Sequence, residues 1–472
     1  MVVPILFLDF VAAMSLAGSV VQVMIADHFG AASYLIMGST GTCRGVLSFL
    51  TSPALGSLSD VIGRKHLFLL TVAGTATPTC CLALGASLET YMVLYGLSGL
   101  FSATFPLAFA YIADHVPPSG RASAYGTAIG LGLGGAFLVG PPLGAWLNDV
   151  YGSSAVFRAC LLLTAANLVF ALVAMPESAR PPPPNYDELF RRANPFSAFA
   201  MLRSNRAMRL LSAIVLCFYV ALWGFLSNKG VYARRRFGIS VSQTAAQLAL
   251  FGLVSTLSQS LGLHFARRAF SEPAIARACF LCAVLSQLTY AFATELWMLY
   301  PAMALLGVSV GGFATISSLC SQAVEHSLVG EAQGVVASMK ALMEGVGPLA
   351  FAWMLPHCEG TPLPGAPWLV SAACMGAACV LCCWLEAFTA DAIEAAVALS
   401  EGVEAEHASD AEQPHESSKL LRRAVYHSGG FAAQGEPMGE LMGGMPRRGS
   451  AGVAEEMQPV KADESDHDTY DS

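Results

Sequence analysis

Long apolar stretches, separated by short segments that hold most of the charged residues, run through all but the C-terminal part of the chain. Each stretch is about 20 residues long, which is the length that a helix needs to cross the hydrocarbon layer of a bilayer. Because a backbone in lipid must satisfy its own hydrogen bonds, such stretches are helices rather than open strands. Twelve membrane helices are predicted, at residues 2–25, 33–58, 67–86, 91–113, 122–147, 155–175, 208–226, 244–265, 275–292, 296–320, 332–355 and 368–388.

The composition agrees with a chain that has lipid as its main solvent. Of the 472 residues, 55% are hydrophobic and only 12% are charged, and the mean hydropathy is +0.56. A soluble domain of this size could not bury so much apolar surface. We therefore expect an all-α, multi-pass integral membrane protein.

The basic residues of the connecting segments predict the orientation. Twelve lie on the side that holds the N-terminus and five on the other, which places both termini in the cytoplasm by the positive-inside rule. The segment from Lys229 to Arg236 is the exception, because it puts four basic residues in a predicted outer loop. The pattern alone gives no reason for this cluster.

Two segments outside the apolar stretches divide the chain. Four consecutive prolines at 181–184 favour a stiff, extended link. They separate an N-terminal six-helix bundle at 1–176, a cytoplasmic linker at 177–207 and a C-terminal six-helix bundle at 208–390. The remaining residues, 391–472, include 17 acidic and 6 basic side chains, so we expect an acidic, disordered cytoplasmic tail.

Thirteen cysteines are present, and most lie inside predicted membrane helices. A zinc site needs two ligand pairs and a wet coordination sphere, and neither is visible in the sequence. We expect small apolar packing residues here, with no metal and no cofactor. No nucleophile–base set or phosphate-binding loop is found either, so the sequence predicts neither an enzyme nor a nucleic-acid-binding protein.

An internal repeat joins the two halves. GPPLGAW begins at Gly140 and GPLAFAW at Gly347, and both read Gly-Pro, four residues, Trp. Each lies in the fifth predicted helix of its half, as a duplicated six-helix unit predicts, and two repeated halves around a cavity are a common transporter plan. Proline bends a membrane helix and glycine lets another helix approach. The candidate helix-bend residues are Gly140, Pro141, Gly144, Gly347 and Pro348.

These motifs carry a family resemblance. GSLSDVIGRK, residues 56–65, resembles the loop signature of the major facilitator superfamily between helices two and three, with Val61 in place of the usual Arg. GPPLGA resembles the antiporter signature of helix five, although symmetry between the halves also explains it as a packing bend. The stretches SFLTSPALGSLSDVIGRKHLFLLTV, FSATFPLAFAYIADHVPPSGRASAYG and LVGPPLGAWLNDVYG resemble the hippocampus-abundant-transcript-like branch, relatives of the tetracycline-resistance exporters.

The resemblance implies a conformational latch on the cytoplasmic side. In the family, the carboxylate corresponding to Asp60 is held by the positive end of helix eleven across the seam between the halves. Arg64 can bridge to Asp114, with Arg121 as a further donor, and the latch opens when the halves rock. The alternative is that these are ordinary loop charges. The matching residues are Gly56, Asp60, Gly63, Arg64 and Lys65, with Asp114 and Arg121 as partners.

Four charges lie deeper in the predicted membrane helices: Asp9, Arg44, Lys340 and Glu344. Each costs at least ~2.5 kcal/mol at a helix centre, and such residues usually face a cavity or a partner. We expect Asp9 to be the proton-coupling carboxylate and Arg44 to pair with Glu344 across the halves. The alternative is two fixed structural pairs, Asp9 with Arg44 and Lys340 with Glu344.

The family architecture implies that helices one, four, seven and ten line the cavity, and their mix of aromatic and small polar side chains suits an organic solute. We therefore expect a secondary active transporter of a small organic solute that works as a monomer by rocker-switch alternating access and is proton-coupled, as an antiporter. The alternatives are a facilitative uniporter of sugar-like solutes and a transporter-like protein that only binds partners. The candidate cavity residues are Gln22, Thr104, Tyr111, Tyr219, Trp223, Asn228, Ser309 and Thr315.

Overall fold

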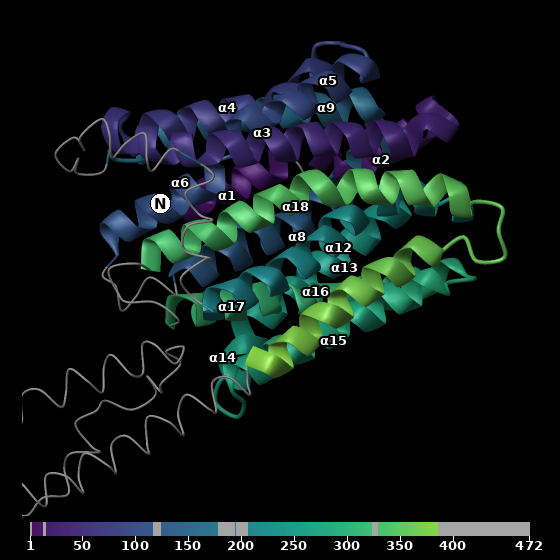
Figure 1. The fold of residues 1–472 in the computed structure, drawn as a ribbon. Coiled ribbons are helices and arrows are strands. Elements are labelled where there is room, and N and C mark those ends of the chain that lie inside the picture. Colours follow the sequence, from purple (N-terminus) through teal and green to yellow (C-terminus); the bar gives the residue numbers. More distant parts are fainter. Residues whose placement is uncertain are drawn as a thin grey trace, which may run out of the picture. The chain divides into compact units, whose positions relative to one another are not determined.

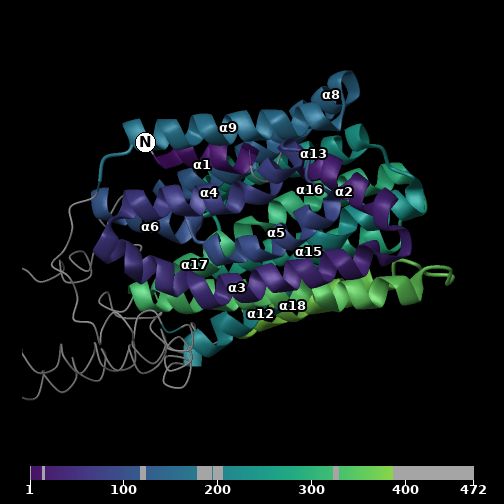
Figure 2. The same ribbon diagram turned by 90° about the horizontal axis from the view of Figure 1, so that it is seen from above.

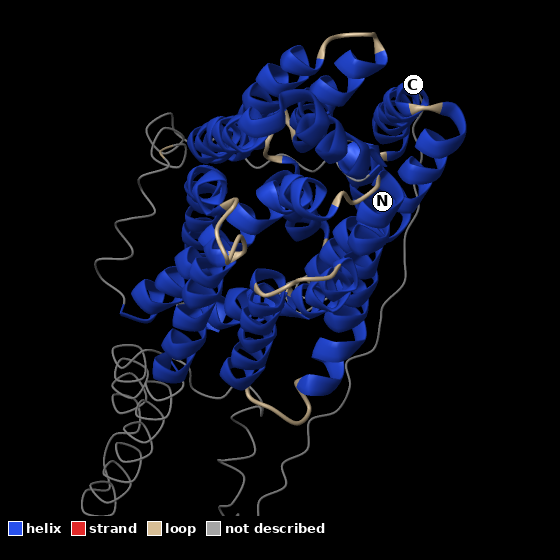
Figure 3. Cartoon of the chain, turned by 90° about the vertical axis from the view of Figure 1, so that its right-hand side faces the viewer, coloured by secondary structure: helices blue, strands red, loops and turns tan. Residues whose placement is uncertain are grey.

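Helices and short connections make up the part of the chain that the structure describes, and this part contains no strand (Figure 3). The computed structural model describes residues 2–12, 16–116, 124–177, 194, 206–322 and 329–385. All of them belong to one unit, Met1–Phe431, whereas a second unit, Ala432–Ser472, lies outside the described residues. The predicted linker, apart from 177, 194, 206 and 207, and the predicted tail also lie outside them.

The helices before and after the linker are called the first and second helix set. The first set consists of α1 Val2–Phe10, α2 Leu16–Phe29, α3 Ser33–Ile62, α4 Arg64–Ala83, α5 Leu88–Leu97, α6 Thr104–His115, α8 Gly135–Tyr151 and α9 Ser153–Ala174. The second set consists of α12 Arg206–Phe237, α13 Val241–Leu257, α14 Leu263–Ala266, α15 Glu272–Ala291, α16 Leu299–Ser309, α17 Gly311–Gln322, α18 Val329–Cys358 and a last helix, Ala366–Leu385.

Several predicted helices are interrupted by a short change of helix type. The 3₁₀ turn η3, Ser98–Phe101, separates α5 from α6, and the π-helical segment η4, Ala128–Gly134, leads into α8. A second π-helical segment, η6 at Ser258–Gly262, joins α13 to α14. A hydropathy pattern does not detect these interruptions, because the side chains remain apolar while only the backbone hydrogen bonding changes.

Eleven helical stretches of the described residues are long and apolar enough to cross a membrane, one fewer than the twelve predicted. The first, Leu16–Ser59, has 44 residues. It would be about 66 Å long, or about twice the hydrocarbon thickness. It contains the 3₁₀ turn η2, Gly30–Ala32, in which Gly30 has a φ of +50°, a conformation that favours glycine. This stretch therefore covers parts of two predicted helices, and the number twelve stays a prediction.

The predicted seventh helix ended at Leu226, and this boundary is wrong. Helix α12 continues to Phe237, so that Lys229 and the three following arginines lie on the helix and not in a loop. Falling hydropathy suggested an end, but Lys and Arg are good helix formers. Tertiary partners hold this last part of α12, as described below.

Large apolar side chains cover the outward faces of several helices. On α9, Leu162 is 69% exposed and Val173 80% exposed, and Trp384 of the last helix is 65% exposed. A water-soluble protein rarely presents such faces, whereas lipid accepts them. These exposed apolar faces therefore support the membrane spans that the length and composition of the helices indicate.

The two helix sets meet mainly along two pairs of helices, and α12 of the second set also contacts α2 and α3 of the first. Helix α3 packs along α18, and the two lie side by side in both Figure 1 and Figure 2. Helix α8 packs along α13. In each pair, the helix of the second predicted span of one set, α3 or α13, packs on the helix of the other set that contains the Gly-Pro repeat, α18 or α8.

Glycines allow the backbones to approach closely at both pairs of helices. A Cβ atom on Gly45 of α3 would overlap the backbone of Gly345 in α18, and the hydroxyl of Thr42 donates a 2.5 Å hydrogen bond to the Gly345 carbonyl. In α13, a Cβ atom on Gly252 would come within 2.5 Å of the backbone nitrogen of Leu138 in α8. Small residues at helix contacts of this kind are typical of membrane proteins.

Candidate functional site

The four charged residues predicted inside the membrane lie on helices at or beside the contact between the two sets. Asp9 is on α1 and is 6% exposed, Arg44 is on α3, and Lys340 and Glu344 are one turn apart on α18. Arg44 lies within electrostatic range of both Asp9 and Glu344. Among the described residues, none of the four has an ion-pair partner within 4.0 Å.

The predicted Arg44–Glu344 pair is therefore not formed as a direct ion pair. The two alternative fixed pairs, Asp9 with Arg44 and Lys340 with Glu344, are not formed at this distance either. The sequence spacing was compatible with all three pairings, because it does not tell which way a side chain turns between neighbouring helices. The charges interact through space without a fixed partner.

Three aromatic rings surround the ammonium group of Lys340. Its Nζ atom lies 5.8 Å from the ring centre of Phe105, 5.6 Å from that of Tyr219 and 5.6 Å from that of Phe313. The rings come from α6, α12 and α17, so that both helix sets contribute. At these distances the negative faces of the rings attract the cation. We call Lys340 and these rings the Lys340 cage.

Arg44 has an aromatic neighbour but lacks a full set of acceptors. Its guanidinium carbon lies 4.9 Å from the ring centre of Tyr95. Its buried Nε atom has no hydrogen-bond partner among the described residues. A buried donor without an acceptor is costly, and its presence at the contact between helix sets is typical of a site that receives water or a solute.

Several of the predicted cavity residues carry buried polar atoms that also lack a hydrogen-bond partner among the described residues. These atoms are Gln22 Oε1, Thr104 Oγ1, Trp223 Nε1 and Asn228 Oδ1. Because most buried polar groups in proteins are hydrogen-bonded, so many orphans suggest a hydrated or ligand-accepting region.

The other predicted cavity residues are placed differently. Tyr219 belongs to the Lys340 cage, whereas the hydroxyls of Ser309 and Thr315 donate to carbonyls of their own helices. The side-chain amide of Asn228 donates to the carbonyls of Gly224 and Pro348, at 3.0 and 3.1 Å, and thereby joins α12 to α18. Tyr111 donates to the Pro176 carbonyl at 3.2 Å. This contact lies at the end of the helices that also holds Asp114.

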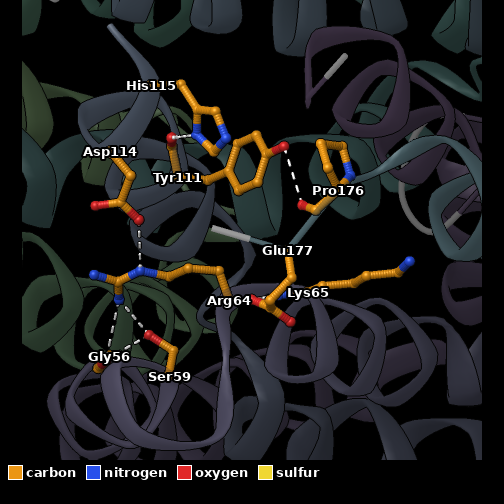
Figure 4. A network of polar contacts seen from close by, with 9 residues as sticks. All are labelled: Gly56, Ser59, Arg64, Lys65, Tyr111, Asp114, His115, Pro176 and Glu177. Atoms are coloured by element: carbon orange, nitrogen blue, oxygen red, sulfur yellow. Dashed lines mark hydrogen bonds and ion pairs between the residues drawn. The ribbon is translucent and has the colours of Figure 1, made fainter. Parts of the chain in front are cut away.

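We call this end, where Arg64, Asp114 and Glu177 lie, the motif end (Figure 4). The predicted Arg64–Asp114 contact is present, with 3.1 Å between Nε and Oδ2. Nη1 of Arg64 donates to the Ser59 hydroxyl and to the Gly56 carbonyl, so the arginine also covers the end of α3. These contacts, drawn as dashed lines in Figure 4, all lie within the first helix set.

Glu177 completes the network at the motif end. Its Oε1 atom accepts the backbone N–H of Lys65 at 3.2 Å, and its Oε2 atom lies 3.2 Å from His66 Nδ1. Gly63 turns the chain between α3 and α4 with a φ of +116°, which explains why the motif needs glycine there. No pattern in the sequence singled out Glu177, although it lies in the PES segment that follows the sixth predicted helix.

Two members of the predicted latch cannot be placed by their side chains. Asp60 is part of α3, but its side chain lies outside the described residues, and Arg121 lies outside them altogether. The contact of Asp60 with helix eleven therefore stays a prediction.

The opposite end of the helices, at Gly30 and Glu359, is called the far end, and its ion pairs involve two of the four basic residues of the α12 cluster, Arg234 and Arg235. Arg234 and Asp27 form a bidentate ion pair with two N–O distances of 2.8 Å, which joins the two helix sets. Arg235 forms a second one with Glu359, with two distances of 2.7 Å, and lies 5.5 Å from the ring centre of Tyr34 on α3. Paired guanidinium–carboxylate bonds of this kind are strong and directional.

Two more polar contacts lie at the far end. The Ser242 hydroxyl donates to Asp149 Oδ2 at 2.6 Å and so joins α13 to α8 across the two sets. His28 and Glu89 approach to 2.7 Å within the first set. Sequence reasoning missed these contacts because the partners are separated by 61 or more residues.

The Gly-Pro repeats lie where helices pack closely. Helices α8 and α18 continue through their prolines. A Cβ atom on Gly144 would overlap the Leu16 backbone, and one on Gly347 would lie 2.6 Å from the Val220 carbonyl oxygen. Gly140, Pro141 and Pro348 are buried. This geometry agrees with a packing role, and nothing in it bears on antiport.

A bundle of apolar-faced helices with charged side chains between two sets defines a polytopic membrane transporter. The chain belongs to the Major Facilitator Superfamily, whose family model matches residues 2–348. This confirms the family resemblance of the motifs, and it places the chain in a family of transporters and not of enzymes.

Relatives and solved structures agree with this assignment. The mouse and human Hippocampus abundant transcript 1 proteins are each 29% identical over 366 residues, covering 76% of this chain and 74% of theirs. The class C tetracycline resistance protein of Escherichia coli is 29% identical over 370 residues, covering 74% of this chain and 85% of that protein. The human organic anion transporter MFSD10 (TETRAN) has a TM-score of 0.63 at 21% identity, covering 81% of this chain and 98% of that one. The nucleoside transporter NupG has a TM-score of 0.58 at 14% identity, covering 82% and 97%. Both structures show the fold alone.

Proposed function

We propose that this chain is a secondary active transporter that moves a small organic solute by rocker-switch alternating access, and that protons drive it. The moving bodies are the two six-helix bundles at 1–176 and 208–390, joined by the linker at 177–207. Both termini lie in the cytoplasm, the segment 391–472 is a cytoplasmic tail, and the protein acts as a monomer.

The observation that carries this proposal is the set of four charged residues at the helix-set contact without direct ion-pair partners among the described residues. A charge at a helix centre costs at least ~2.5 kcal/mol, and a purely structural pair would reduce this cost by direct contact. Side chains that stay unpaired can instead receive a proton or a charged solute. Asp9, buried on α1 and within electrostatic range of Arg44, is the carboxylate that takes up and releases the proton.

The polar contacts support alternating access. At the far end, Arg234–Asp27 and Ser242–Asp149 join the two helix sets. At the motif end, the contacts of Arg64 described above stay within the first set. Rocking of the two sets would break these far-end contacts and form the predicted Asp60 contact at the motif end.

An organic solute is favoured over a bare ion by the aromatic rings and unsatisfied polar atoms at the helix-set contact. The names of the related proteins point the same way, because tetracycline, organic anions and nucleosides are all organic molecules.

The test is uptake into proteoliposomes that contain the purified full-length chain, with and without an imposed pH gradient, using a panel of labelled organic solutes. We expect accumulation that depends on the gradient. Asp9→Asn should abolish gradient-driven accumulation, because an amide cannot carry the proton, while exchange of solute on the two sides continues. Glu295→Gln is the matched control, since Glu295 is an exposed carboxylate outside the site.

Full accumulation by Asp9→Asn would remove Asp9 from the coupling step. Transport that does not respond to the gradient in the wild type would favour the facilitative uniporter. Binding without any transport would favour the protein that only binds partners.

A further inference from the structure

We propose that Lys340 binds the acid group of an aromatic organic anion, and that such anions are the class of solute carried. This inference rests on the proposed transport function and names the substrate of the same site.

The surroundings of Lys340 leave its ammonium group available to an acid. Its three N–H donors have no hydrogen-bond acceptor among the described residues, and its neighbours are the rings of the Lys340 cage. Glu344 is the carboxylate within electrostatic range, but it is not within ion-pair distance. A carboxylate or sulfonate that enters between the rings would supply the missing acceptor.

A cationic solute fits this place poorly. Aromatic cages of this type attract cations, but here the ammonium of the protein already occupies the position that a solute cation would take. A second cation would meet like-charge repulsion from Lys340. Glu344 lies within electrostatic range of both Lys340 and Arg44, and Asp9 lies within that of Arg44, so the four groups carry a net positive charge when Asp9 holds its proton.

The rings beside Lys340 account for the aromatic part of the solute. Phe105 continues into a row of rings in the first helix set, with centre distances of 4.9 Å to Phe10 and 5.7 Å to Phe109. On the other side, Phe313 meets Tyr219 edge-on at 5.3 Å. A flat aromatic ring attached to the acid group can stack on the faces of these rings, whereas a sugar has no aromatic ring to stack.

Lys340 also contacts both helix sets through its rings, because Phe105 belongs to the first set and Tyr219 and Phe313 to the second. A solute bound there would touch both moving bodies. Its binding energy would therefore depend on how the two sets are arranged, as alternating access requires.

The experiment compares three probes of the same shape: naphthalene-1-sulfonate, the neutral naphthalene-1-sulfonamide and naphthyl-1-trimethylammonium. Binding to the purified full-length chain is measured by calorimetry, and uptake by proteoliposomes. The sulfonate stays charged at all relevant pH values, so it does not cross the bilayer as a neutral acid. We expect the wild type to bind the sulfonate at least about tenfold more tightly than the other two, or about 1.4 kcal/mol.

The variants separate charge from fold. Lys340→Gln should weaken sulfonate binding at least about tenfold, whereas Lys340→Arg should keep most of it because the positive charge remains. Glu344→Gln is the companion variant on the same helix, and it should bind the sulfonate more tightly than the wild type, because a competing carboxylate is removed. Thermal melting of each variant shows whether it is folded.

Equal sulfonate binding by the wild type and Lys340→Gln would overturn the inference, as would equal or tighter binding of the neutral or cationic probe, or no binding of the sulfonate. If the cationic or neutral probe is accumulated and the sulfonate is not, the substrate class is wrong while the transport function stands. If no solute of the wider panel is transported, the proposed function itself fails.

Discussion

Removing the ion pair between Arg234 and Asp27 should open the far end of the protein. The pair is bidentate and joins α12 of the second helix set to α2 of the first. The perturbation is Arg234→Gln or Asp27→Asn, with the exchanged variant Arg234→Asp/Asp27→Arg as a test of the pairing itself. Each single variant removes this cross-set contact. Arg234→Gln also removes the hydrogen bonds from Nη1 to the carbonyls of Gly238 and Ile239, whereas Asp27→Asn leaves them in place.

The size of the effect follows from the exposure of the pair. The Arg234 side chain is 30% exposed and that of Asp27 51% exposed, so water screens much of the attraction. Exposed pairs contribute about 0.2–1 kcal/mol, and the bidentate geometry places this one near the upper value. A loss of about 1 kcal/mol changes the ratio of two conformations about fivefold. We expect a shift of this size toward the state with an open far end.

The assay is distance measurement between spin labels by pulsed electron resonance. Labels at Tyr151 and Glu295, which are exposed residues of the two helix sets at the far end, report the opening. They should be attached through unnatural amino acids, because the chain has 13 cysteines. The long-distance population should rise in both single variants and fall again in the exchanged variant, at low ionic strength most clearly.

Glu89→Gln is the matched control for this prediction. It removes the negative charge from the His28–Glu89 contact, which lies at the same end but within the first helix set, and should leave the distances unchanged. If the single variants give the wild-type distance distribution, or if Glu89→Gln shifts it equally, the Arg234–Asp27 pair does not hold the far end closed.

Three further predictions follow from other contacts. Gly45→Val should push α3 away from α18, because its Cβ atom would overlap the Gly345 backbone. We expect a loss of about 1–3 kcal/mol in stability, measured as a lower melting temperature in detergent. Gly56→Val is the control, because the structure leaves space for a Cβ atom at that position. Arg64→Gln should slow solute exchange and Arg64→Lys should slow it less, because lysine keeps the charge but not the fork of donors that reaches Asp114; equal rates for both would contradict this. Thr104→Val should change solute affinity with little loss of stability, because its buried hydroxyl has no partner among the described residues, and a large fall in melting temperature would show that the hydroxyl is structural.

Much about the helices follows from the order of the residues alone. An apolar stretch of sufficient length becomes a membrane helix wherever it lies, so the spans were predictable within a few residues at most positions. The loop motif from Gly56 to Lys65 identified the family, because a local feature of the sequence, Gly63 at a positive φ, makes the turn between α3 and α4. Asp9, Arg44, Lys340 and Glu344 could also be identified as candidate site residues from the sequence, because a charge inside an apolar stretch is costly in lipid.

The tertiary structure decided which of these residues meet. The end of α12 looked like a loop in the sequence, but it is helical because Arg234 and Arg235 find Asp27 and Glu359, 207 and 124 residues away. Lys340 looked like a partner of Glu344, yet its ammonium lies among rings from three other helices. Hydrophobic length determines each helix separately, whereas side-chain partners depend on how the helices cross and rotate, and this is decided by packing between segments far apart in the chain.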